Sequence, residues 1–67
     1  MKKIKEVREL LNKGNKYKVV HWYYKKRMEH TIYFKKNGVS HFRVSVSNLK
    51  KLMKEYDLDI ESKTIAV

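Results

Sequence analysis

The first apolar pattern along the chain has the spacing of a helix. Its members recur at intervals of three and four residues and are Ile4, Val7, Leu10 and Leu11. Lysine, arginine and glutamate fill the positions between them, so the pattern predicts an amphipathic helix over about Lys2 to Lys13. Gly14 comes directly afterwards, where a residue in the left-handed conformation ends many helices.

The pattern changes to that of β-strands after residue 16. Residues 17–25 are rich in aromatic and β-branched side chains, and apolar residues alternate with polar ones over 31–35 and again over 41–46. Together these segments predict a three-stranded antiparallel meander. One of its faces is apolar and contains Ile32, Phe34, Phe42 and Val44.

The connection between the second and third strands contains Asn37-Gly38, the commonest dipeptide of a two-residue hairpin loop. Such a loop would leave both faces of the hairpin mixed, whereas a three-residue loop over 36–38 would keep one face apolar. Because a slip of one residue exchanges the two faces, we expect the hydrophobic pattern to select the three-residue loop. The pairs that it predicts are Ile32 with Phe42, Tyr33 with His41, and Thr31 with Arg43.

A second helix follows the meander. Ser47 is a suitable N-cap, and helical spacing continues to about Asp57 through Leu49, Leu52, Met53 and Tyr56. The tail after Leu58 alternates weakly, which leaves room for a short C-terminal strand. The expected fold is therefore α+β in the order α-β-β-β-α, with both helices on one face of the meander. We expect residues 1–67 to form a single small basic domain.

Both faces of the segment 17–25 are apolar, so alternation does not decide which face meets the helices. Trp22 has the largest apolar side chain, and its burial would contribute most to a small core. We therefore expect Val20 and Trp22 to face the helices, and the opposite arrangement, with Tyr23 inward, stays open. The expected outward set is His21, Tyr23, Lys25, Thr31, Tyr33, Lys35, His41 and Arg43.

The net charge of the chain indicates which class of molecule the protein binds. The chain has 17 Lys and Arg against 7 Asp and Glu, for a formal net charge of +10. Sixteen of the basic residues and only three of the acidic ones precede Glu55, so the excess belongs to the body of the domain and not to a basic tail. This distribution predicts an ordered basic surface and a polyanionic partner.

Composition also excludes several classes of protein. The chain has no cysteine, so disulfide scaffolds, thiolate zinc sites and cysteine nucleophiles are absent. No apolar run approaches the length of a membrane span, and the N-terminus has no apolar stretch of a signal peptide. We therefore expect a cytoplasmic protein with no membrane partner.

The uncovered sheet face supplies the candidate binding residues. Lysine and arginine neutralise phosphates, and tyrosine and histidine rings can stack on unpaired bases. The basic turn after the first strand and the tip of the second hairpin would hold phosphates on either side of Tyr33. The candidate nucleic-acid-binding residues are His21, Tyr23, Lys25, Lys26, Arg27, Tyr33, Lys35, Lys36, His41 and Arg43.

Catalysis and metal binding have weaker support in the sequence. The three histidines lack the spacing of a zinc motif, and we expect neither a metal nor another cofactor. His41, with Arg43 beside it and Tyr33 opposite, has the residue types of a metal-independent ribonuclease of the toxin type. Whether the protein is an enzyme stays uncertain, and the non-enzymatic interpretation is favoured.

Three families share the order of elements, but the sequence is assigned to none of them. Residues 47–51 have the lysines of a double-stranded RNA-binding domain but not its alanines, and the segment from Tyr17 to Tyr56 is similar only in outline to the arm-binding domain of tyrosine integrases. Residues 38–41, Gly-Val-Ser-His, match the Gly-Ser-His signature of HicA-type toxins only in part.

The leading hypothesis is a nucleic-acid-binding module that uses the open basic and aromatic sheet face, with DNA slightly favoured over RNA. A small inhibitor or adaptor that binds an acidic protein surface is the first alternative, and the ribonuclease is the second. A homodimer formed through an exposed edge strand is also left open.

Overall fold

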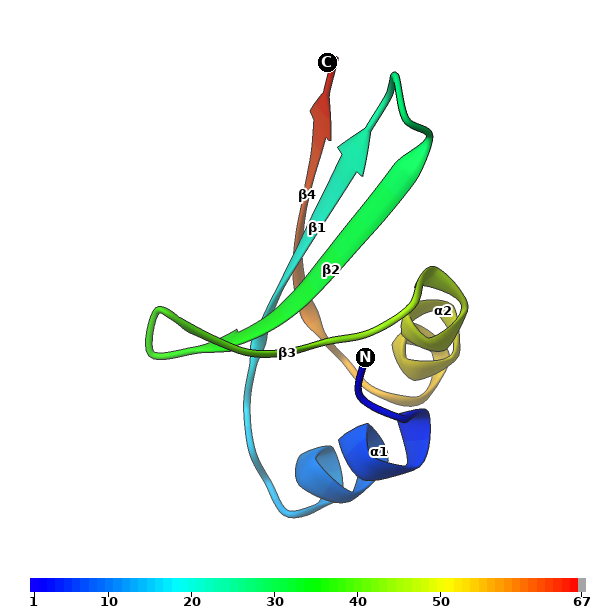
Figure 1. Cartoon of the computed structure of the whole chain (residues 1–67). Coiled ribbons are helices and arrows are strands. Elements are labelled where there is room, and N and C mark those ends of the chain that lie inside the picture. Colours follow the sequence, from blue (N-terminus) through cyan, green and yellow to red (C-terminus); the bar gives the residue numbers. More distant parts are fainter. Residues whose placement is uncertain (67) are drawn as a thin grey trace.

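A computed structural model describes residues 1–66 of the chain (Figure 1). The elements are α1 (Ile4–Asn12), β1 (Lys18–Tyr24), β2 (Glu29–Lys36), β3 (Val39–Arg43), α2 (Val46–Glu55) and β4 (Asp59–Ile65). The predicted α+β fold is confirmed. The tail forms a full seven-residue strand, which pairs in parallel with β1 and extends the meander to a four-stranded mixed sheet of order β3-β2-β1-β4.

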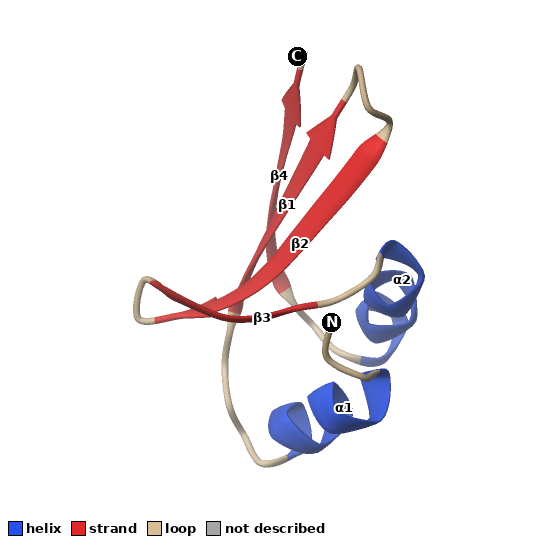
Figure 2. Ribbon diagram, in the orientation of Figure 1, coloured by secondary structure: helices blue, strands red, loops and turns tan. Residues whose placement is uncertain are grey.

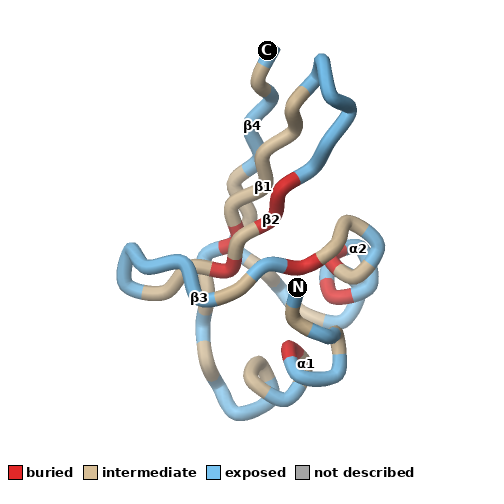
Figure 3. Tube along the Cα trace, viewed as in Figure 1, coloured by how far each residue is buried: buried red, intermediate tan, exposed pale blue. Residues whose placement is uncertain are grey.

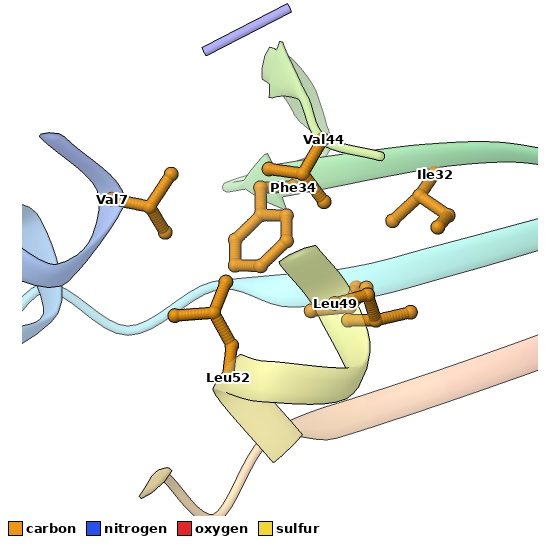
Figure 4. Packing of buried hydrophobic residues seen from close by; sticks show 7 residues of the cluster. Val7, Ile32, Phe34, Val44, Leu49 and Leu52 are labelled. Carbon is orange, nitrogen blue, oxygen red and sulfur yellow. The ribbon is translucent and has the colours of Figure 1, made fainter. Parts of the chain in front are cut away.

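Both helices lie on the same side of this sheet, as Figure 2 shows. The helices and the sheet enclose a small hydrophobic core, and each core residue is at most 5% exposed. The core residues are Val7, Val19, Ile32, Phe34, Val44, Leu49 and Leu52 (Figure 4). The ends of β1 and β2 at the β1–β2 turn and the C-terminal end of β4 extend beyond the helices, and the residues of that turn are exposed (Figure 3).

The direction of the β1 side chains is opposite to the prediction. Val19 is fully buried and pairs with Phe34 on one side and Ile60 on the other, so the odd-numbered residues of β1 face the helices. Val20 and Trp22 therefore lie on the uncovered face. The prediction rested on the size of the Trp22 side chain, but Val19 of the opposite parity fills the core position between Phe34 and Ile60, and this sets the direction of β1.

The β2–β3 hairpin also differs from the prediction. Lys36 pairs directly with Val39, so the loop has two residues, and both take the positive φ of a type I′ turn: 54° at Asn37 and 77° at Gly38. A β-bulge at His41 then shifts the register, so that Phe34 pairs with Phe42 and Tyr33 with Arg43. One extra residue in β3 thus satisfies both the turn and the hydrophobic pattern.

The helix ends depart modestly from the predicted bounds. α2 begins two residues early, because Ser45 is the N-cap and its Oγ accepts a hydrogen bond from the Asn48 N–H at 3.2 Å. Met53, which continues the apolar helical spacing of the sequence, is not part of the core and is 53% exposed. The prediction at the end of α1 is confirmed: Gly14 has a φ of 92°, and its N–H donates to the Leu11 carbonyl at 3.0 Å.

Candidate nucleic-acid interface

The sheet face turned away from the helices combines rings with cations. β1 and β2 pair so that Trp22 lies opposite Thr31 and Val20 opposite Tyr33, and Arg43 of β3 lies beside Tyr33. Neither helix covers this face (Figure 2). We call this surface the open face. Its residues include Lys18, Val20, Trp22, Tyr24, Tyr33, Lys35, Ser40, Arg43, Glu61 and Lys63.

A shallow hollow of about 300 Å³ lies at the centre of the open face, and we call it the aromatic hollow. It is lined by Val20, Trp22, Tyr24, Tyr33, Lys35 and Ser40. The three rings are half-buried, so each keeps part of its surface available. A hollow lined by indole and phenol rings offers flat apolar surfaces of the kind on which planar ligands stack.

Each ring of the aromatic hollow has a cation against it. The Arg43 Cζ lies 5.5 Å from the centre of the Tyr33 ring, and the Lys63 Nζ lies 5.5 Å from that of Trp22. The Arg27 Cζ lies 4.5 Å from the centre of the Tyr24 ring. Cation–π contacts at exposed sites contribute about 0.5–1 kcal/mol each, which is enough to bias these cations toward the rim of the hollow. Positive charge is therefore held beside every ring.

A second and larger hollow of about 650 Å³ lies between the α1–β1 loop and the tip of the β2–β3 hairpin. We call it the lysine hollow, and it is lined by Lys13, Gly14, Asn15, Lys16, Lys18, Val20, Lys35, Lys36, Asn37, Gly38 and Glu61. Five lysines and one glutamate give this lining a strongly positive potential. Val20 and Lys35 line both hollows, so the two adjoin each other.

Contacts within the lysine hollow orient some of its side chains. The Lys36 Nζ donates to the Asn15 Oδ1 at 3.0 Å, and the Lys18 Nζ lies 3.3 Å from the Glu61 carboxylate. The hydrogen bond from Lys18, with the charges of Lys18 and Lys63, lowers the pKa of Glu61 below its ordinary value. Glu61 is therefore ionised at neutral pH and offsets one of the five lysine charges.

Seven of the ten candidate residues lie where a ligand on the open face or at its ends would meet them. Tyr33, Lys35 and Arg43 lie on the open face, and Lys36 lines the lysine hollow. The remaining members of this group occupy the exposed β1–β2 turn and are Lys25, Lys26 and Arg27.

Three candidate residues were placed wrongly. His21 and Tyr23 face the helix side, because the β1 direction is reversed. His41 is the extra residue of the bulge, and its ring packs edge-on against Tyr17 with centroids 5.9 Å apart. It therefore does not lie opposite Tyr33 as predicted. The ribonuclease hypothesis loses the side-chain arrangement on which it was built.

Sequence reasoning missed Trp22 and Tyr24, although the alternative direction of β1 that it left open would have included both. It also missed Lys63, because this lysine reaches Trp22 only through the parallel pairing of β4 with β1. Lys13, Lys16 and Lys18 meet in the lysine hollow through the loop after α1, and no spacing in the sequence signals that arrangement.

A pair of histidines lies on the helix side of the sheet. The His21 Nε2 and the His30 Nδ1 are 2.7 Å apart, and the Ser62 Oγ lies 3.3 Å from the other His21 ring nitrogen. Partial burial, together with the charge of His30, lowers the pKa of His21. Within residues 1–66, no three His, Cys, Asp or Glu side chains gather as a metal site would require.

Comparisons of the chain with protein-family models, with curated proteins and with solved structures find no match. Over the described residues, neither helix has the length and apolar character that crossing a membrane needs.

Proposed function

We propose that the protein is a nucleic-acid-binding module that holds an unpaired strand on its open face. The observation that carries this proposal is the contact between the two hollows, which share Val20 and Lys35. One hollow is lined by five lysines and the other by three aromatic rings. A polynucleotide strand has the same two components, phosphates and flat bases, in adjacent positions.

The lysine hollow accounts for affinity. Each phosphate that a lysine neutralises releases condensed counterions, and this release favours binding without reading the base sequence. Because only Glu61 opposes the five lysines of the lining, most of that charge is available to a phosphate backbone. The exposed basic turn Lys25–Arg27, at the far end of β1, extends positive charge along the direction in which a strand would continue.

The aromatic hollow accounts for the preference for an unpaired strand. The flat surfaces of paired bases are covered by their neighbours in a duplex, whereas those of single-stranded bases are free to stack on protein rings. Trp22 and Tyr33 present such rings at the centre of the open face. The cations beside them lie close enough to the rings to contact the phosphate of a stacked nucleotide.

Salt dependence tests the phosphate contacts. Fluorescence anisotropy would measure the binding of a labelled 12-mer as single-stranded DNA, as RNA and as duplex. If four of the lysines contact phosphates, the single-strand slope of log K against log salt is about −3, or about a 60-fold loss of affinity between about 50 and 200 mM salt. Binding that does not change with salt, or no binding, would contradict the proposal.

A pair of matched charge reversals tests the location of the interface. Lys16→Glu changes the lysine hollow, and Lys50→Glu changes an exposed position of α2 by the same amount of charge. We expect a several-fold loss of affinity for Lys16→Glu and a clearly smaller one for Lys50→Glu. Equal losses would mean that binding follows net charge alone. Competition by polyglutamate as strong as that by the oligonucleotide would favour an acidic protein partner instead.

A further inference from the structure

One edge of the four-stranded sheet is formed by β4. Among residues 1–66, β4 is the last strand of the sheet and pairs only with β1. The opposite edge of the sheet is partly occupied, because the Lys2 N–H donates to the Arg43 carbonyl at 3.0 Å. A bare edge strand presents unpaired N–H and C=O groups with which another strand can pair.

The backbone of β4 determines which residues present those groups. The Ile65 carbonyl accepts a hydrogen bond from the Lys25 N–H at 2.9 Å, so the peptide groups of Ile65 point toward β1. Because these groups alternate in direction along a strand, those of Ile60, Ser62 and Thr64 point outward. A strand added to this edge must therefore pair through even-numbered residues.

We propose that two copies of the chain associate through β4, antiparallel and centred on Ser62. In that register Ser62 pairs with Ser62 of the second copy, and Ile60 pairs with Thr64. Glu61 then lies directly opposite Lys63 of the second copy, in the closely spaced non-hydrogen-bonded position. The two-fold symmetry repeats this contact, so the interface contains two pairs of opposite charge.

The neighbouring registers are disfavoured by the same side chains. Centring the pair on Glu61 would place two carboxylates opposite each other, and centring it on Lys63 would do the same with two ammonium groups. Like charges directly opposite each other on adjacent strands are destabilising. The sequence of β4 therefore selects the Ser62 register.

The charge of β4 also explains why association would use this edge. The chain carries a net charge of +10, so most of its surface repels a second copy. β4 contains Asp59, Glu61 and a single lysine, which makes it a strand of net negative charge. β4 is therefore the strand of the sheet at which a second copy meets the least repulsion.

The symmetry of such a pair has a structural consequence. The two-fold axis of an antiparallel strand pair is perpendicular to the sheet, so each face of one copy continues into the same face of the other. The dimer would have one continuous sheet with all helices on one side. Its other side would join the two open faces.

Analytical ultracentrifugation of nucleic-acid-free protein over a range of concentrations tests the proposal, with circular dichroism as a control for folding. We expect a reversible monomer–dimer equilibrium. Glu61→Lys alone and Lys63→Glu alone each replace attraction by repulsion in two pairs and weaken the dimer about 30-fold. The double variant with both changes restores opposite charges and should recover most of the lost association.

A backbone variant provides an independent test. Ser62→Pro removes an N–H that points outward, so the β1–β4 pairing is retained while the centre of the dimer loses its donors. We expect this variant to be folded and monomeric. A monomeric wild-type protein at millimolar concentration, or a dimer that survives both Ser62→Pro and Lys63→Glu, would overturn the proposal.

Discussion

Trp22→Ala is the change that most directly tests the aromatic hollow. The chain has a single tryptophan, and the open face places its indole beside Tyr33 and Tyr24. Stacking of one base on a protein ring contributes about 1–3 kcal/mol. Because the ring is half-buried and has the Lys63 ammonium near it, we take the lower part of this range, about 1–2 kcal/mol. The expected loss of affinity for a single strand is therefore about 5- to 30-fold.

The matched control is the next residue. Tyr23→Ala also removes an aromatic ring from β1, but Tyr23 faces the helix side, where its ring lies 4.5 Å from that of His30. Anisotropy titrations at one low salt concentration would compare the two variants with the wild-type protein on the same oligonucleotide. We expect Tyr23→Ala to change affinity less than twofold.

Two further measurements sharpen this test. Stacking should change the fluorescence of Trp22 as the single strand is added, and duplex binding should be weakened less by Trp22→Ala than single-strand binding. Equal losses for Trp22→Ala and Tyr23→Ala would refute the assignment of the open face. Unchanged tryptophan fluorescence at saturation would refute stacking on Trp22.

Three further predictions concern the fold. Ser45→Ala should lower the free energy of unfolding, measured in urea, by about 1 kcal/mol, because the Ser45 hydroxyl accepts a hydrogen bond from the first turn of α2. Ser47→Ala should have little effect on that free energy. A larger loss of stability for Ser47→Ala than for Ser45→Ala would contradict the assignment of Ser45 as N-cap. Deleting His41 should leave a protein that still unfolds cooperatively, because the deletion removes the bulge and keeps Phe34 opposite Phe42. Loss of cooperative unfolding in this variant would show that the fold requires the bulge. The pKa of His21 is lowered in the folded state, so the unfolded chain binds more protons and stability falls as the pH drops below about 6.5. His21→Gln should flatten that decline, and an unchanged pH profile would contradict it.

Some features of the candidate site follow from local patterns. The lysines of the hairpin tip and of the β1–β2 turn were identified from the sequence, because turns expose whatever charges they contain. The outward positions of Tyr33 and Arg43 followed from alternation on strands with one clearly apolar face. β1 has two apolar faces, and there the same reasoning chose the wrong one.

The amino-acid sequence by itself determined the number, type and order of the first five elements, the cap at Gly14 and the basic character of the body of the domain. These features depend on periodicity and on the preferences of single residues, which act within a few positions of the chain. Tertiary structure alone decided the direction of β1, the bulge at His41 and the partner of β4. Each of these depends on contacts between distant segments. The direction of β1 is the clearest example, because Val19 is buried only where Ile60 and Phe34 flank it and the helices cover it.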